Sequence, residues 1–297
     1  MIELARVAKR FGREAAVDDL SFNAPGGAIT GFVGPNGAGK STVLRMIAGL
    51  IRPDSGTIGI DGEVFPSAPR PASMLGIFIS PEWLPPRATP RGLLEYVCLS
   101  QGLSPRLGRN ALGEAGLDRV ATKRIRELSL GTRQRLGIVA ATVAGPRTLL
   151  LDEPMSGLDQ DGIAWLRELL FTVSRTGATV LISSHDLGEL AQSADHIVLI
   201  AKGALLAEGS LSDLAALGGE EQIYVECVDR DLLVERLRQN GFEYRASGNS
   251  GLLITGGSAE EIGQLAFKTG AGLRHLSTST RSLEQVYRDI TRRGKGR

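Results

Sequence analysis

The stretch that decides the fold is Gly34-Pro35-Asn36-Gly37-Ala38-Gly39-Lys40-Ser41-Thr42. It fits the phosphate-loop pattern GxxxxGK followed by Ser or Thr. The apolar run 28–33 predicts a strand immediately before the loop, and the periodicity of 43–50 predicts an amphipathic helix immediately after it. A strand, a glycine-rich loop and a helix in this order predict a binding site for a nucleoside triphosphate.

The residue types of this loop suit polyphosphate chemistry. Glycines allow backbone N–H groups to turn toward the phosphates without interference from a Cβ atom. Lys40 supplies a positive charge for the β- and γ-phosphates, and the hydroxyl of Ser41 is expected to bind Mg²⁺. The phosphates then lie at a helix N-terminus, where unpaired N–H groups and the helix dipole favour negative charge. The alternative is a glycine-rich turn that only caps a helix.

The composition narrows the class of protein. A chain of 297 residues with 42% apolar and 23% charged residues is long enough for a large core and a second, smaller domain. Its net charge of +1 gives no global electrostatic case for nucleic-acid binding, so no nucleic acid is expected as a partner. Cys98 and Cys227 lack CxxC spacing, which disfavours a zinc site or a disulfide framework. No segment has the ~18 apolar residues that span a membrane, and the N-terminus lacks a signal-peptide pattern, so any span is expected on another chain.

Apolar strands and helical patterns alternate over residues 1–217. This alternation predicts an α/β domain with a largely parallel sheet. Proline, glycine and helical periodicity replace the strand pattern over about 81–145, so a mostly helical insert is expected there. The strands are expected at 2–7, 28–33, 75–79, 148–151, 179–183 and 196–200.

Residues 218–297 form the second predicted domain. The glycines and glutamates at 218–221 mark its start, and the order β-α-β-β-α-β after them suggests a small α+β, ferredoxin-like accessory domain with a final helix. No residue pattern in this part indicates a binding site. Its elements are expected at 222–228, 231–240, 242–246, 251–254, 258–270, 273–277 and 283–291.

A second motif with site chemistry is a buried strand that ends in two carboxylates. The residues 148–151 are apolar after Thr148, and Asp152 and Glu153 follow them directly. We expect this strand beside the phosphate loop, with Asp152 next to Mg²⁺, usually through water. Glu153 would then polarise the attacking water, because water is a poor nucleophile without a base. The alternative is a strand that ends in a solvated acidic turn.

Five further segments, in a fixed order with these two, make the chain resemble the nucleotide-binding ATPase subunits of ABC transporters. The resemblance covers about residues 1–217 and implies the P-loop NTPase fold of ABC type, with a core sheet and a helical subdomain. The five segments are Lys9-Arg10-Phe11-Gly12, Phe78-Ile79-Ser80-Pro81-Glu82, Leu128-Ser129-Leu130-Gly131-Thr132-Arg133-Gln134, Ser156-Gly157-Leu158-Asp159 and Ser183-Ser184-His185.

The first two of these segments lie near the expected nucleotide. The resemblance implies that the whole loop 34–42 binds ATP and that Phe11 stacks on adenine, although Phe11 also suits an ordinary core position. Ser80 stands where the family usually has a glutamine that touches Mg²⁺ and faces the membrane partner. A serine hydroxyl is shorter and would act through water, and the neighbouring Glu82 is an alternative to it.

The third and fourth segments imply a dimer. Ser129 and the Gly131 amide lie where the family's signature motif, commonly LSGGQ, contacts the γ-phosphate of ATP held by the other subunit, and we expect a helix from near Thr132. Asp159 would reach across the same dimer and couple the two sites. Each has a structural alternative, because Ser129 and Asp159 also suit helix N-caps. The motif departs from the family at Leu130, which replaces a glycine, and at Thr132, which replaces the usual glutamine.

The resemblance implies a mechanism in which Glu153 assists hydrolysis and His185 senses the γ-phosphate. Two ATPase domains, either two copies or a copy and a homologous subunit, would sandwich two Mg-ATP molecules head to tail and move a multi-span membrane permease. The variant signature and the C-terminal appendage resemble the exporters of drugs, antibiotics and peptides, which work at the cytoplasmic face of the plasma membrane. The alternatives are an ABC-type ATPase in chromosome maintenance or translation, and a regulatory subunit that binds ATP with little turnover.

Overall fold

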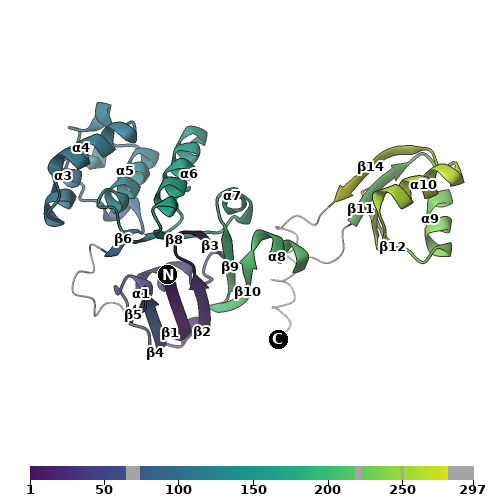
Figure 1. Cartoon of the computed structure of the whole chain (residues 1–297), viewed down its shortest axis with the longest axis horizontal. Helices are drawn as coiled ribbons and strands as arrows, with labels where there is room; N and C mark the ends of the chain where they lie inside the picture. The colour runs from purple at the N-terminus through teal and green to yellow at the C-terminus, as the bar shows by residue number, and fades with distance from the viewer. Residues whose placement is uncertain (65–73, 218–221, 249–250, 280–297) are drawn as a thin grey trace. The chain divides into compact units, whose positions relative to one another are not determined.

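The computed structural model describes residues 1–64, 74–217, 222–248 and 251–279 of the chain (Figure 1). The chain divides into two compact units, Met1–Leu211 and Ser212–Arg297. The division falls slightly before the boundary at 217/218 that the sequence predicts. The predicted helix 283–291 lies outside the described residues.

The first unit contains a six-stranded sheet in the order β10-β9-β3-β8-β7-β6. Every neighbouring pair in it is parallel except β9 and β10, which are antiparallel. The parallel part was predicted from the alternation of strands and helices, whereas β10 was not predicted. The strands are β3 (Ile29–Val33), β6 (Leu75–Phe78), β7 (Thr148–Leu151), β8 (Thr179–Ser184), β9 (His196–Ala201) and β10 (Ala204–Ser210).

A second, antiparallel sheet of the same unit has the order β2-β1-β4-β5. The sequence predicted only the first half of β1. It missed the others because β2 carries an acidic pair and β4 carries two glycines, which weaken a strand pattern. The strands are β1 (Ile2–Phe11), β2 (Glu14–Ala24), β4 (Ser55–Ile60) and β5 (Glu63–Val64).

One apolar cluster joins both sheets to the helix that follows the phosphate loop. That helix, α1, spans Lys40–Ile47 and contributes Leu44 to the cluster. Phe22 of β2 and Phe32 of β3 stack in it with ring centroids 5.2 Å apart. Each such buried side chain stabilises the fold by about 1.5–3 kcal/mol, so the phosphate loop rests on a rigid base.

The regular structure between β6 and β7 is entirely helical. Its elements share an apolar cluster to which Leu94, Leu112 and Leu136 contribute. In Figure 1 helices α3, α4 and α5 lie together at one side of the first unit. The elements are the 3-10 turns Pro81–Trp83, Asp118–Val120 and Ile125–Glu127 and the helices α3 (Pro90–Ser100), α4 (Pro105–Glu114) and α5 (Leu130–Thr142). Within residues 152–217, the structure describes three further helices: α6 (Gln160–Arg175), α7 (Leu187–Ala191) and α8 (Leu211–Leu217).

The second unit has the predicted order β-α-β-β-α-β. Its strands form one antiparallel sheet in the order β12-β13-β11-β14, and its apolar cluster includes Ile223, Leu237 and Ile262. This strand order is that of a ferredoxin-like sandwich. The elements are β11 (Gln222–Cys227), α9 (Arg230–Gln239), β12 (Glu243–Ser247), β13 (Gly251–Thr255), α10 (Ala259–Thr269) and β14 (Leu273–Ser279).

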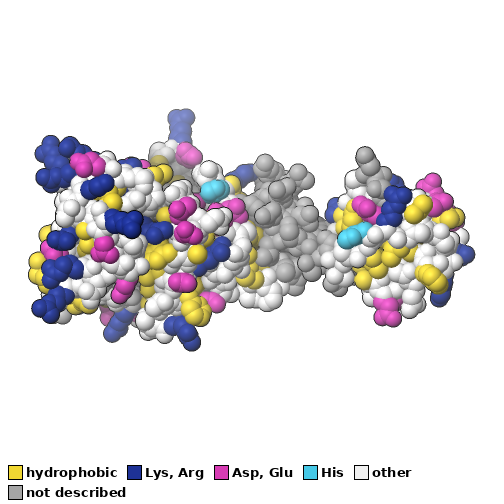
Figure 2. All heavy atoms as spheres, turned by 90° about the horizontal axis from the view of Figure 1, so that it is seen from above, with side chains coloured by type: hydrophobic (Ala, Val, Ile, Leu, Met, Phe, Trp, Pro, Cys, Tyr) yellow, Lys and Arg dark blue, Asp and Glu magenta, His cyan; other side chains and the backbone are white. Residues whose placement is uncertain are grey.

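The charges on the surface are mixed in sign, and both cysteines are buried. Lys and Arg side chains are interspersed with Asp and Glu on the face shown in Figure 2. Cys98 and Cys227 are both unpaired and buried, and burial raises the pKa of the Cys227 thiol. Within the described ranges, no helix is long and apolar enough to cross a membrane.

Candidate functional site

The phosphate loop has a backbone that only glycine fits at two of its positions. Gly39 has a φ of 101° and precedes α1 as its N-cap, and a Cβ there would lie 2.4 Å from the carbonyl oxygen of Ala16. A Cβ at Gly34 would lie 2.7 Å from the carbonyl oxygen of Ile200. Because the N-cap has no side chain, the first N–H groups of α1 are available to an anion.

Lys40 lies at the first position of α1, and its side chain is only 6% exposed. Its Nζ donates to the carbonyl oxygen of Gly34 at 2.7 Å and lies 3.2 Å from Oε1 of Glu153. The ammonium group is therefore directed along the loop toward the end of β7. This is the position from which a cation can contact a phosphate on the loop.

The side chain of Glu153 contacts two other predicted residues, Lys40 and His185. Its Oε1 contacts Lys40, and its Oε2 lies 2.8 Å from Nδ1 of His185, whose side chain is 57% exposed. Glu153 follows β7 and His185 follows β8, which is parallel to it, so both side chains emerge at the same edge of the sheet. The sequence predicted each residue separately, and the structure brings them into contact.

The strand that carries Asp152 and Glu153 ends close to Lys40 of the phosphate loop, although it does not pair with the strand that leads into that loop. Strand β8 lies between β7 and β3. The last residues of β8 contact both sides. The N–H of Gly34 donates to the carbonyl oxygen of Ser184 at 3.3 Å. The hydroxyl of Ser183 donates to Oδ1 of the buried Asp152. The backbone N–H of Glu153 donates to the same Ser183 hydroxyl at 2.9 Å. Sequence analysis did not identify a role for Ser183.

Glu189 on α7 adds a further carboxylate close to this edge. Burial raises the pKa of Glu189 above its ordinary value, and the nearby negative charge of Asp186 raises it further. Asp186 itself caps α7 and accepts hydrogen bonds from the N–H groups of Gly188 and Glu189 at 2.7 and 3.2 Å. A partly buried acid next to His185 was not predicted.

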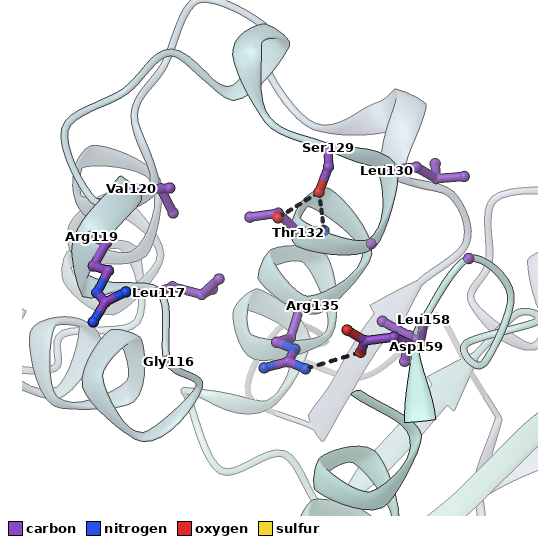
Figure 3. Close-up of a pocket in the computed structure, with 12 residues that line it drawn as sticks. Gly116, Leu117, Arg119, Val120, Ser129, Leu130, Thr132, Arg135, Leu158 and Asp159 are labelled. Atoms are coloured by element: carbon purple, nitrogen blue, oxygen red, sulfur yellow. Dashed lines mark hydrogen bonds and ion pairs between the residues drawn. The ribbon is translucent and has the colours of Figure 1, made fainter. Parts of the chain in front are cut away.

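The signature residues lie around a hollow of about 600 Å³ (Figure 3). Ser129 caps α5 and accepts a hydrogen bond from the N–H of Thr132 at 3.2 Å, so the helix begins at Leu130 and not near Thr132 as expected. The described residues lining the hollow come from the region 116–120, from the first turns of α5 and from the loop before α6, and none belongs to the phosphate loop.

Gly131 and Asp159 lie at one wall of this hollow. A Cβ at Gly131 would be 2.7 Å from the carbonyl oxygen of Gly157, so the start of α5 packs directly on the loop. Asp159 caps α6 by accepting from the N–H of Gly162 at 2.8 Å, and its side chain is 80% exposed. Figure 3 shows its carboxylate facing the guanidinium of Arg135, with 3.7 Å between Nη2 and Oδ1.

Phe11 and Ser80 have contacts of their own. Phe11 ends β1 with an exposed ring, over which Nζ of Lys9 lies 5.7 Å from the centroid, so it is not a core aromatic. Ser80 caps the 3-10 turn Pro81–Trp83 by accepting from the N–H of Glu82 at 3.3 Å. Its hydroxyl therefore already has a local partner.

Comparisons with known proteins identify the family of most of the chain. Residues 17–156 match the ABC transporter family, and residues 221–284 match a domain family of unknown function. The lantibiotic transport ATP-binding protein SrtF of Streptococcus pyogenes is 32% identical over 208 residues, which are 70% of this chain and 90% of that protein. The chain belongs to the ABC transporter ATP-binding proteins.

Two more relatives of this ABC protein are informative. The bacitracin transport ATP-binding protein BcrA of Bacillus licheniformis is 31% identical over 297 residues, covering 97% of this chain and 96% of that protein. The dimeric structure of a bacterial ABC transporter cassette has a TM-score of 0.66 at 25% identity and covers 71% of this chain and 99% of that one. The ABC protein described here is therefore an ATPase of the ABC transporter family.

The structure thus groups the predicted residues of the ABC protein into two sets. Lys40, Asp152, Glu153 and His185 lie near the carboxyl edge of the sheet, whereas Ser129, Gly131 and Asp159 line the hollow. The individual roles of these residues remain predictions. Sequence analysis included Gln134 in the signature segment without giving it a role, and it did not single out Arg135, although both lie on α5.

Proposed function

We propose that the chain binds ATP on the loop 34–42 and hydrolyses it with Glu153 as the base, and that this reaction powers export through a separate membrane subunit. The observation that carries the proposal is the position of the Glu153 carboxylate. It lies between Lys40 and His185, at the edge of the sheet where the phosphate loop opens α1. A carboxylate in this position can act on a water molecule beside a bound γ-phosphate.

The nucleotide site has groups for each part of ATP. The N–H groups at the start of α1 and the Lys40 ammonium group would bind the phosphates, and the exposed ring of Phe11 would stack on adenine. For binding, Lys40 would exchange its contact with Glu153 for contacts with phosphate oxygens. Glu153 would then be free to contact water.

We propose Mg²⁺ as the accompanying ion, held by Ser41 and Asp152. The buried Asp152 supplies one carboxylate, and Mg²⁺ commonly binds through one or two carboxylates together with substrate phosphates. The described ranges hold no cluster of three His, Cys, Asp or Glu that could bind a metal ion. When bound, the ion would neutralise charge on the β- and γ-phosphates. Ser80, which is engaged in its own cap, would reach such an ion only through water.

Hydrolysis then needs one proton transfer and one displacement. Glu153 accepts a proton as the water oxygen forms its bond to the γ-phosphorus, and the bond from that phosphorus to the bridging oxygen breaks. The products are ADP and inorganic phosphate. We propose that His185, 2.8 Å from the same carboxylate, contacts the γ-phosphate and responds to its release.

The hollow at the start of α5 supports a dimeric mechanism. It presents Ser129, the Gly131 amide and Asp159, but no phosphate-loop residue of this chain lines it. We propose that a second copy, or a homologous ATPase subunit, presents its own bound ATP to this hollow. The dimer of the similar bacterial cassette supports this arrangement.

We infer the class of cargo and the membrane partner from the names of the relatives. SrtF and BcrA are named for lantibiotic and bacitracin transport, so a drug, an antibiotic or a peptide is the proposed cargo class. We propose that the chain works at the cytoplasmic face of the plasma membrane, bound to a multi-span permease. Trp83 and Tyr96 are exposed in the helical region and are candidate contacts for that permease.

The experiment that tests the proposed function is Glu153→Gln, with Glu63→Gln, at an exposed position of β5, as a control. We expect ATP hydrolysis to fall at least about 100-fold in the first variant and to be unchanged in the second. ATP-dependent dimerisation, measured by light scattering, should persist in Glu153→Gln, because binding does not need the base. Full turnover in Glu153→Gln would remove Glu153 from its proposed role.

A further inference from the structure

The side chain of Gln134, on α5, contacts the backbone directly after the proposed base. It is 3% exposed, and its Nε2 lies 3.1 Å from the carbonyl oxygen of Glu153 and 3.2 Å from that of Pro154. A side-chain amide has two N–H donors, so this geometry uses both of them on two consecutive carbonyls. Buried hydrogen bonds of this kind are costly to leave unmade, which fixes the two peptide groups relative to α5.

The backbone at Glu153 needs such support. Its φ is +46°, in the left-handed region that side-chain-bearing residues seldom adopt. Strained conformations of this type persist only where the surrounding structure imposes them. Here the Ser183 hydroxyl accepts from the N–H of Glu153, and Gln134 donates to its carbonyl oxygen. The direction of the Glu153 carboxylate toward Lys40 and His185 therefore depends on both neighbours.

The same turn of α5 contacts the rest of this loop. Gly131 packs against the carbonyl oxygen of Gly157, and the Arg135 guanidinium lies 3.7 Å from Asp159. The wall of the hollow and the backbone of Glu153 are therefore attached to one helical turn. A displacement of α5 would move both.

We propose that Gln134 is a positioning residue for hydrolysis: it transmits the position of α5, whose first turn lines the hollow, to the backbone of Glu153. This inference deepens the proposed function and rests on Glu153 being the base. A nucleotide seated at the hollow would contact the N-terminus of α5, and the two Gln134 hydrogen bonds would carry any resulting shift to the carboxylate. Gln134 itself does not touch the reacting atoms.

The test uses the purified full-length chain and two substitutions of similar length. Gln134→Met keeps the volume and removes both donors, whereas Gln134→Glu keeps the shape and places carboxylate oxygens against two carbonyl oxygens. Thr142→Val is the matched control, because the Thr142 hydroxyl lies on the same helix and donates only within it, to the carbonyl oxygens of Ile138 and Val139. For each variant kcat, KM, the ATP dissociation constant and Tm are measured.

We expect kcat to fall about 10–100-fold in both Gln134 variants, since misplacing a catalytic group by about 1 Å has an effect of that size. The ATP dissociation constant and KM should change less than about threefold, because the phosphate loop is untouched. Adding Gln134→Met to Glu153→Gln should slow the residual rate no further, since the two residues act as one unit. Thr142→Val should match the unchanged chain in every measurement.

Two outcomes would overturn the inference. A kcat within about twofold of the unchanged chain would show that the hydrogen bonds do not position the base. Loss of the folded state in both Gln134 variants, or a parallel loss of kcat, ATP affinity and Tm, would show a purely structural role. The Glu153→Gln variant separates this inference from the proposed function: if it keeps full turnover, the proposed base is wrong, whereas if it is inactive while Gln134→Met is active, only the inference fails.

Discussion

At the scale of single residues, the phosphate loop is constrained by its neighbours as much as by its ligand. Gly39 combines a left-handed backbone with a carbonyl oxygen, that of Ala16, at the place where a Cβ would stand. Gly145 also has a positive φ, of 64°, but it has open space around it. A side chain at Gly145 would therefore add only backbone strain, whereas a side chain at Gly39 would add strain and a steric clash.

We predict that Gly39→Ala weakens ATP binding about tenfold or more. The new Cβ would clash with Ala16, and a strain of about 1–3 kcal/mol would distort the loop that binds the phosphates. Gly145→Ala should lower Tm and leave ATP affinity unchanged, since it carries similar strain outside the site. Isothermal titration with ATP and thermal unfolding distinguish the two effects. Equal ATP affinity in the two variants would contradict the prediction.

The carboxyl of Glu189 gives a pH-dependent prediction at the same scale. Its pKa is raised by burial and by Asp186, so the folded state favours the protonated form. Its contribution to stability is thus most favourable below the ordinary glutamate value of 4.5 and is lost as the pH rises. At pH 7, Glu189→Gln should raise Tm by no more than about 3 °C.

This gain should shrink as the pH is lowered to about 4, where the glutamate of the unchanged chain is protonated in both states. Thermal unfolding at the two pH values is the measurement. A gain in Tm that does not change between them would mean that burial of the charge is not the cause.

At the scale of elements, α5 lies very close to β6. A Cβ at Gly137 would be 2.1 Å from the ring of Phe78, whose carbonyl oxygen accepts a hydrogen bond from the N–H of Asp152. By contrast, a Cβ at Gly113 on α4 would meet only the side-chain tip of Asp118, at 3.4 Å. The absence of a side chain at Gly137 therefore sets the distance between the signature helix and the strand next to β7.

We predict that Gly137→Ala destabilises the chain by about 1–3 kcal/mol through overpacking against Phe78. Gly113→Ala should be neutral or slightly stabilising, because alanine favours a helix that glycine weakens. Denaturant titration of both variants gives the free energies of unfolding. A neutral Gly137→Ala would mean that α5 can move away from β6 without loss.

The elements also show how far sequence reasoning reaches. The parallel strands β3, β7 and β8 were predicted closely, because buried parallel strands are continuous apolar runs. Strand β2 was missed because its acidic residues obscure the alternation. The start of α5 was expected near Thr132, two residues later than the helix that Ser129 caps in the structure. Contacts between distant segments, such as Gln134 with Glu153, depend on tertiary packing and leave no pattern in a single sequence.

At the scale of the whole molecule, two units with separate apolar clusters predict two separable unfolding events. The phosphate loop, Glu153 and the hollow all belong to the unit Met1–Leu211. A chain ending at Leu217 should therefore bind ATP with an affinity within about twofold of that of the full chain. Titration of both proteins with ATP tests this, and a large loss of affinity would assign residues beyond 217 to the nucleotide site.

Calorimetry of the full chain offers a complementary prediction. Ser258 and Glu261 form a capping box at the start of α10, with hydrogen bonds of 2.9 and 3.1 Å. Ser258→Ala should cost about 1 kcal/mol and lower only the transition of the second unit, by about 4–8 °C. Ser104→Ala removes the cap of α4 and should lower only the other transition. A shift of both transitions by either variant would contradict independent unfolding.

The burial of Cys98 and Cys227 has a practical consequence. With both native thiols shielded, one in each unit, a cysteine introduced on the surface would be the preferred target of a maleimide fluorophore. A dye attached beside the hollow, for example at Arg119, would report by energy transfer whether two labelled copies approach each other when ATP is added. Whether ATP brings two copies of the chain together can thus be followed in real time without first replacing either native cysteine.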